Sequence, residues 1–182
     1  LRAIPGPDGK GTRVVGTGKA WVRRLDNGFF RELTGGLPRI ETRLERGPDK
    51  VLRFEGLELY SPGLRLSGRG FRRTDGSFRI EASGRQAKYG PVRMVLDGPI
   101  ARPNIILLLG APNEAMGLRA VRLSLVPSAS GFDYRAEGGS QIGDFVSQGQ
   151  ILLPPGRQAS VNIASLTVSG IRASGVLQAV SG

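Results

Sequence analysis

Apolar and polar residues alternate with a period of two along most of this chain, and this alternation limits what it can fold into. The clearest runs cover residues 40–45, 64–67, 78–82, 121–125 and 132–136. Successive side chains of a strand point to opposite faces, so each run predicts a strand with one apolar and one polar face. Helix-period apolar stripes over ten or more residues are almost absent. The sequence therefore predicts an all-β fold, with helix confined to a turn or two.

Turn-forming residues separate these runs, as expected between short strands. The clearest hairpin is predicted from Leu64–Arg73 and Phe78–Gly84, which flank Thr74-Asp75-Gly76-Ser77. Asp-Gly favours the positive φ angles of a tight hairpin turn. One helical turn is predicted near Pro112–Met116. Other turn signals lie at Asp26-Asn27-Gly28, Gly35-Gly36, Gly47-Pro48-Asp49, Pro62-Gly63 and Pro154-Pro155-Gly156.

Two pairs of similar segments within the sequence suggest a stacked repeat. The segment Leu57–Gly68 shares a Ser-Gly-aliphatic-Arg-x-Ser-Gly frame, with a two-residue gap, with Leu166–Gly175. Phe78–Gly84 (FRIEASG) is echoed by Phe132–Gly138 (FDYRAEG). Such echoes are expected when one supersecondary unit is stacked repeatedly, although short β segments can also be similar by chance. We expect residues 1–182 to form a single β-repeat segment.

The chain is strongly basic, with a net charge of +11 from 26 basic and 15 acidic residues, and 22 of the basic residues are arginine. This balance favours nucleic acid, anionic lipid head groups or an acidic partner. The alternative is an arginine-rich solvated surface with no specific anion partner. Arg65, Arg69, Arg72 and Arg73 lie close to Phe71, a composition found in single-strand nucleic-acid binders. Because aromatic residues make up only 6% of the chain, we expect no nucleic acid as partner.

Histidine and cysteine are both absent, which removes the commonest general base, the usual catalytic triad and thiolate metal sites. The acidic residues are scattered singly, without a calcium-binding loop. A glycosidase pair of carboxylates depends on a spatial separation that sequence does not give. We assign no catalytic residue, no metal and no cofactor, and expect a protein that is not an enzyme.

Two segments resemble the TamB family, which belongs to the AsmA-like inter-membrane bridge proteins. The first is Phe78–Leu109, with an aromatic-x-aliphatic-x-Ala-x-Gly strand, the Tyr89-Gly90-Pro91 turn and the Gly98–Pro103 linker (GPIARP). The second is Ala159–Ala179, a run of alternating aliphatic and small residues. Together they span about half of the chain. The motifs are degenerate β-repeat patterns and carry no catalytic residues.

The resemblance implies a long antiparallel, solenoid-like sheet, curled into a taco-like trough with an apolar inner face. It further implies a periplasmic protein of a diderm bacterium, anchored in the inner membrane, that conducts phospholipid toward the outer membrane. Aid to outer-membrane protein assembly, with an Omp85-type barrel as partner, is also implied. The longest apolar run, Ile105–Leu109, is far shorter than the roughly 20 residues of a membrane-spanning helix. We therefore expect this chain to be a fragment of a longer protein whose anchor lies elsewhere.

The alternation assigns sixteen side chains to one apolar face, which would contact phospholipid acyl chains. A face of this kind can stay open as a trough, or it can be covered by a second layer as a closed core; alternation does not separate the two. The closed-core alternative predicts a structural or protein-binding segment whose edge strands pair with a partner. The candidate residues are Leu57, Leu59, Leu64, Leu66, Phe78, Ile80, Met94, Leu96, Val121, Leu123, Leu125, Phe132, Tyr134, Ile163, Leu166 and Val168.

Overall fold

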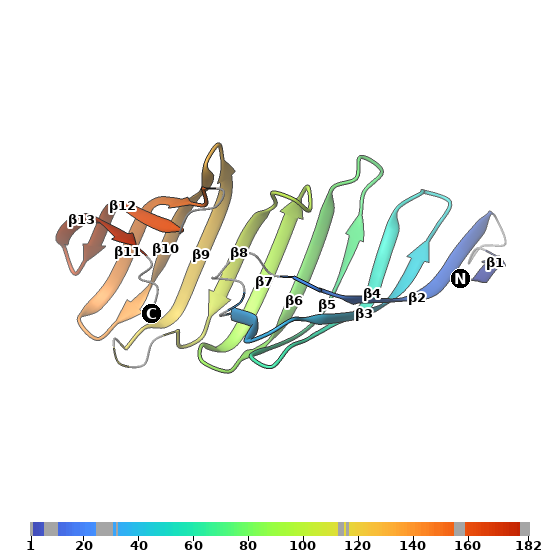
Figure 1. Cartoon of the computed structure of the whole chain (residues 1–182), viewed down its shortest axis with the longest axis horizontal. Coiled ribbons are helices and arrows are strands. Elements are labelled where there is room, and N and C mark those ends of the chain that lie inside the picture. The colour runs from blue at the N-terminus through green and yellow to red at the C-terminus, as the bar shows by residue number, and fades with distance from the viewer. Residues whose placement is uncertain are drawn as a thin grey trace.

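The computed structural model describes residues 2–5, 11–24, 31, 33–112, 115, 117–154 and 159–178, and these form one sheet. Thirteen strands lie side by side in sequence order, from β1 at one end to β13 at the other (Figure 1). Every neighbouring pair is antiparallel. The strands are β1 (Arg2–Pro5), β2 (Thr12–Trp21), β3 (Arg39–Arg46), β4 (Leu52–Tyr60), β5 (Leu64–Arg72), β6 (Phe78–Gln86), β7 (Gly90–Gly98), β8 (Asn104–Leu109), β9 (Arg119–Ser128), β10 (Gly131–Ser140), β11 (Gly143–Leu152), β12 (Ser160–Val168) and β13 (Ile171–Gln178).

The predicted hairpin at Asp75-Gly76 is confirmed as β5 and β6, but its turn differs in detail from the prediction. Gly76 has a φ of +89°, whereas the φ of Asp75 is negative. The Asp75 carboxylate instead accepts hydrogen bonds from the backbone N–H of Ser77 at 2.8 Å and from its hydroxyl at 2.7 Å. A five-residue loop closes with the Arg73 N–H donating to the Ser77 carbonyl at 2.8 Å. Asp75 therefore stabilises the turn through the hydrogen bonds of its side chain and does not adopt a left-handed backbone conformation.

Close packing of the hairpin strands explains a glycine in β6. A Cβ added at Gly84 would lie 1.9 Å from the carbonyl oxygen of Arg65 in β5, far inside van der Waals contact. The backbones of the two strands therefore approach as they do only because position 84 has no side chain.

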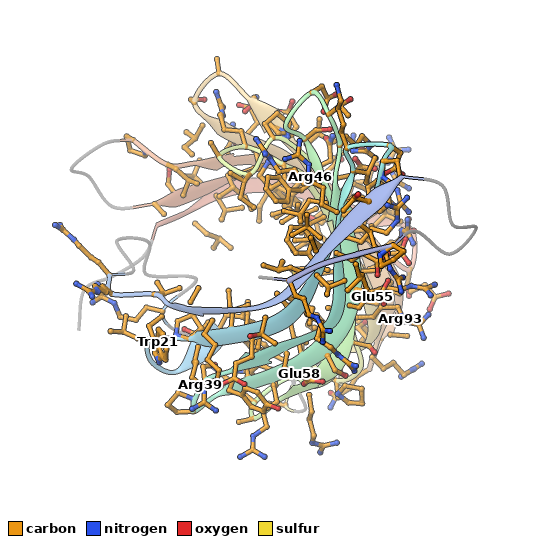
Figure 2. All side chains as sticks on the ribbon, turned by 90° about the vertical axis from the view of Figure 1, so that its right-hand side faces the viewer. Trp21, Arg39, Arg46, Glu55, Glu58 and Arg93 are labelled. Atoms are coloured by element: carbon orange, nitrogen blue, oxygen red, sulfur yellow. The ribbon has the colours of Figure 1, made fainter. Side chains whose placement is uncertain are left out.

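Each strand pairs with its neighbours in the sequence, and these neighbouring pairs make nearly all of the contacts between strands. The sheet is a single open layer, and within the described ranges no second layer of strands lies on either face. The predicted all-β, elongated antiparallel architecture is confirmed; the curled trough remains a prediction. Register shifts interrupt five of the strand pairs, and such bulges bend strands. Figure 2, a view along the sheet, shows strands that bend along their length.

Helix in the described part of the chain is limited to one short turn before β3, containing Arg31, Leu33 and Thr34. The helical turn predicted at residues 112–116 falls largely outside the described residues, as do the turns predicted at 26–28 and 154–156. Both sequence echoes lie at equivalent places in the sheet. Residues 57–68 run from the end of β4 into β5, and residues 166–175 run from the end of β12 into β13, so both form hairpins. Residues 78–84 form the start of β6, and residues 132–138 lie near the start of β10.

Candidate functional site

All sixteen predicted apolar residues lie on the same face of the sheet, which we call the apolar face. Directly opposed residues of antiparallel strands share a face, so the strand register assigns each side chain. One row runs across twelve strands, through Gly16, Leu44, Phe54, Gly70, Ile80, Leu96, Ile105, Leu125, Tyr134, Gly149, Ile163 and Gly175. The neighbouring row continues from Leu57 to Leu166 through Met94 and Leu123. The register thus places these residues on one face, and their contact with lipid stays a prediction.

The centre of the apolar face is buried although only one layer forms it. Leu66 and Leu107 are each 5% exposed, and Tyr134 is 9% exposed. The buried residues form two clusters, and Met94 packs against both, so they are continuous. Tyr134 places its polar tip against Ser147, with the two hydroxyl oxygens 2.9 Å apart. Side-by-side crowding of neighbouring strands therefore buries these side chains and satisfies the tyrosine hydroxyl.

Several residues of this face were missed by the sequence analysis. Val92, Ile105 and Leu107 are buried members of the two clusters. Ile105 and Leu107 lie in the run Ile105–Leu109, where every residue is apolar, so alternation gives no phase there. The register of β7 against β8 supplies the phase, because Met94 opposes Leu107. A reading of the apolar run together with its neighbouring strand could have found them.

The apolar face is bordered along one side by the helical turn before β3. Leu33 packs against the cluster that contains Leu64 and Leu66. The side-chain amide of Gln86 donates to the Leu33 carbonyl at 3.2 Å, and the Gly63 N–H donates to the Thr34 carbonyl at 2.7 Å. This side of the face, at the starts of β5 and β7, is therefore closed by the chain itself.

The opposite face, which we call the polar face, carries most of the charge. Figure 2 shows the labelled Glu55, Glu58 and Arg93 side chains on the same outer side of the ribbon. Asp97 binds two guanidinium groups there, those of Arg73 at 2.9 Å and Arg79 at 2.8 Å. The hydrogen bonds from Arg73 and then Arg79 hold the pKa of the Asp97 carboxyl below its ordinary value. The polar face is thus a solvated surface with local ion pairs.

The basic cluster considered for nucleic acid is divided between the two faces. Arg65 and Arg69 lie on the polar face, whereas the register places Arg72 on the apolar face, opposite Leu52 and Phe78. The Arg73 guanidinium lies over the Phe71 ring at 5.2 Å and also binds Asp97, so a base could stack on that ring face only by displacing it. The structure therefore does not assemble the four arginines and Phe71 into one surface.

No family model, curated protein or solved structure matched this chain in comparisons with known proteins. The described residues contain no group of acidic side chains arranged to hold a metal ion. Among those same residues, no helix has the length and apolar content needed to cross a membrane.

Proposed function

We propose that the apolar face binds the acyl chains of lipids, and that the chain is a binding protein rather than an enzyme. The observation that supports this is the continuous apolar face itself, which crosses the sheet and has no second layer over it in the described residues. A continuous apolar face that no second layer covers is the kind of surface that marks a binding site for an apolar partner. An acyl chain is a flexible apolar partner that can follow the rows between strands.

The free energy available is sufficient for binding. Each methylene group removed from water contributes about 0.8 kcal/mol. An acyl chain that buries eight methylenes against half-buried residues such as Met94, Leu96 and Leu123 gains roughly 6 kcal/mol before its loss of freedom is subtracted. Thirteen strands at about 4.8 Å spacing make a face nearly 60 Å long, which offers room for more than one lipid.

The resemblance extends this proposal to a physiological role. The chain would form one stretch of a periplasmic bridge, anchored in the inner membrane, along which phospholipid passes toward the outer membrane. A curled, trough-like form of the sheet belongs to this proposal, as does an outer-membrane barrel as partner of the full-length protein.

A second candidate function is binding of a partner strand at the edge of the sheet. Among the described residues β13 pairs on one side only, and Ile171, Val176 and Leu177 are all exposed. Its eight residues contain no proline and one charge, Arg172, so the edge lacks the usual protection against pairing. The β1 edge is four residues long and contains Pro5 and Arg2, so strand addition is favoured at β13.

The experiment that tests lipid binding compares one residue on each face. Leu123 lies on the apolar face between Leu107 and Ala136, and Val126 lies in the same strand on the polar face with 53% exposure. The purified protein should carry phospholipid that native mass spectrometry and solvent extraction detect. Leu123→Arg should lose most of that lipid, and Val126→Arg, with the same added charge, should keep it. Absence of lipid from the unmodified protein, together with no uptake of added lipid, would refute the proposal.

A further inference from the structure

Three cationic residues gather at the side of the apolar face opposite the helical turn. Arg46 ends β3, Arg72 ends β5, and the register places both directly beside Leu52 of β4 on the apolar face. Lys50 lies in the turn between β3 and β4. Figure 2 labels Arg46 and Arg39 at the two ends of β3. We call Arg46, Lys50 and Arg72 the basic rim.

The three charges of the basic rim have no carboxylate partner in the described part of the chain. The acids closest to them in sequence have other partners, because Glu45 binds Arg13, Asp49 binds Arg53, and Asp75 accepts hydrogen bonds from Ser77. Asp97 binds Arg73 and Arg79. The Arg72 guanidinium lies over the Phe78 ring, 5.8 Å from its centroid. Three adjacent cations repel one another, so their arrangement favours an anion between them.

A pocket of about 170 Å³ lies among these side chains. Its lining consists of Arg46, Lys50, Leu52, Arg72, Arg73 and Thr74. Four of the six residues are basic, and Leu52 joins the pocket to the apolar face. The next residues inward on that face are Leu44 and Phe54, about 7 Å further along their strands. An anion in this pocket would therefore lie one row away from apolar surface.

We propose that the basic rim binds the phosphate group of a diacyl phospholipid whose acyl chains lie on the apolar face. Arginine forms bidentate hydrogen bonds with phosphate oxygens, and lysine adds a point charge. The helical turn closes the other side of the face, so the head group is directed to the basic rim. This inference rests on the proposed function and adds to it a head-group site, the basic rim, which would hold the phosphate group.

The test uses two short-chain lipids with the same fluorescent acyl chain, one a phosphatidylglycerol and the other a diacylglycerol. Fluorescence anisotropy gives the Kd of each for the purified protein. The rim variant is Arg46→Gln/Lys50→Gln/Arg72→Gln. The control variant is Arg65→Gln/Arg85→Gln/Arg93→Gln, which removes the same charge from polar-face arginines that have no ion-pair partner among the described residues. Thermal melting checks that both variants fold.

We expect the unmodified protein and the control variant to bind the phosphatidylglycerol at least about tenfold more tightly than the diacylglycerol, which corresponds to about 1.4 kcal/mol. The rim variant should bind the two lipids equally. Equal binding by the unmodified protein, or the same loss in both variants, would overturn the rim as a phosphate site while lipid binding stands. Displacement of the phosphatidylglycerol by millimolar inorganic phosphate would also overturn it, because the site would then recognise free phosphate. Failure of both lipids to bind would instead refute the proposed function.

Discussion

Replacement of Leu66 by alanine measures whether the apolar face is open or covered. Leu66 is 5% exposed, clusters with Leu64, Ala82 and Val92, and opposes Leu59. The change removes three carbon groups from this surface, and at about 0.8 kcal/mol each their transfer to water costs roughly 2.4 kcal/mol. In an enclosed core a residual cavity adds to this cost, and buried Leu→Ala changes reach about 5 kcal/mol. On an open face water or lipid fills the space, so only the cost of transfer to water remains. We therefore expect the free energy of unfolding to fall by about 2 to 3 kcal/mol.

The assay is urea unfolding followed by far-ultraviolet circular dichroism, with lipid removed from the protein beforehand. Leu177→Ala is the control, since Leu177 lies on the same face but is 61% exposed. We expect it to change the free energy of unfolding by less than about 0.5 kcal/mol. A Leu66→Ala loss above about 4 kcal/mol would show a sealed core and contradict the open face. A loss as small as that of the control would show that neighbouring strands do not bury Leu66.

Two further predictions follow from the packing and the ion pairs. Gly84→Ala should destabilise the sheet by roughly 1 to 3 kcal/mol or more, because the added Cβ would lie 1.9 Å from a backbone oxygen. Gly175→Ala is the control: its Cβ would have nothing within 4 Å, so the change should be neutral or slightly stabilising. Thermal melting measures both variants. Asp97→Asn should lower stability by at most about 1 kcal/mol at pH 7, since the pair is surface-exposed. The folded-state pKa of Asp97 is lowered, so its contribution is present above the ordinary aspartate pKa and is lost as pH falls through the folded-state value. The variant and the unmodified protein should therefore converge as the pH is lowered, and a stability difference that does not narrow at all on acidification would contradict this assignment.

The sequence predicted the apolar face better than it predicted the turns or the basic rim. Alternation has the period of the strand itself, so Leu64, Leu66 and Ile80 could be assigned to one face without their partners. The five-residue loop after Arg72 depends on side-chain hydrogen bonds that the dipeptide Asp75-Gly76 does not specify. By contrast, the separation of Arg72 from Arg65 follows from their opposite phases in β5, and the alternation could have predicted it.

The basic rim was not predictable because its three residues come from two hairpins. Arg46 and Lys50 are close in sequence, but Arg72 is brought beside Leu52 only by the register of β4 against β5. A bulge between Phe54 and Leu57 shifts that register, and local sequence gives no clear sign of it. Knowledge of the pairing, rather than of the strands alone, is needed to place these charges together.

The pairing of each strand with its sequence neighbours also has consequences for folding and for the length of the protein. The strand pairing itself requires no long loop to close, so assembly can begin at a central hairpin and extend outward, and the end strands should open at lower denaturant than the middle. Hydrogen exchange should then be fastest at β1 and β13. A hairpin added or deleted at any turn would change the length of the apolar face by roughly 10 Å and leave the remaining strands in register. A sheet of this kind can be adjusted to the distance that it must span by gain or loss of hairpins.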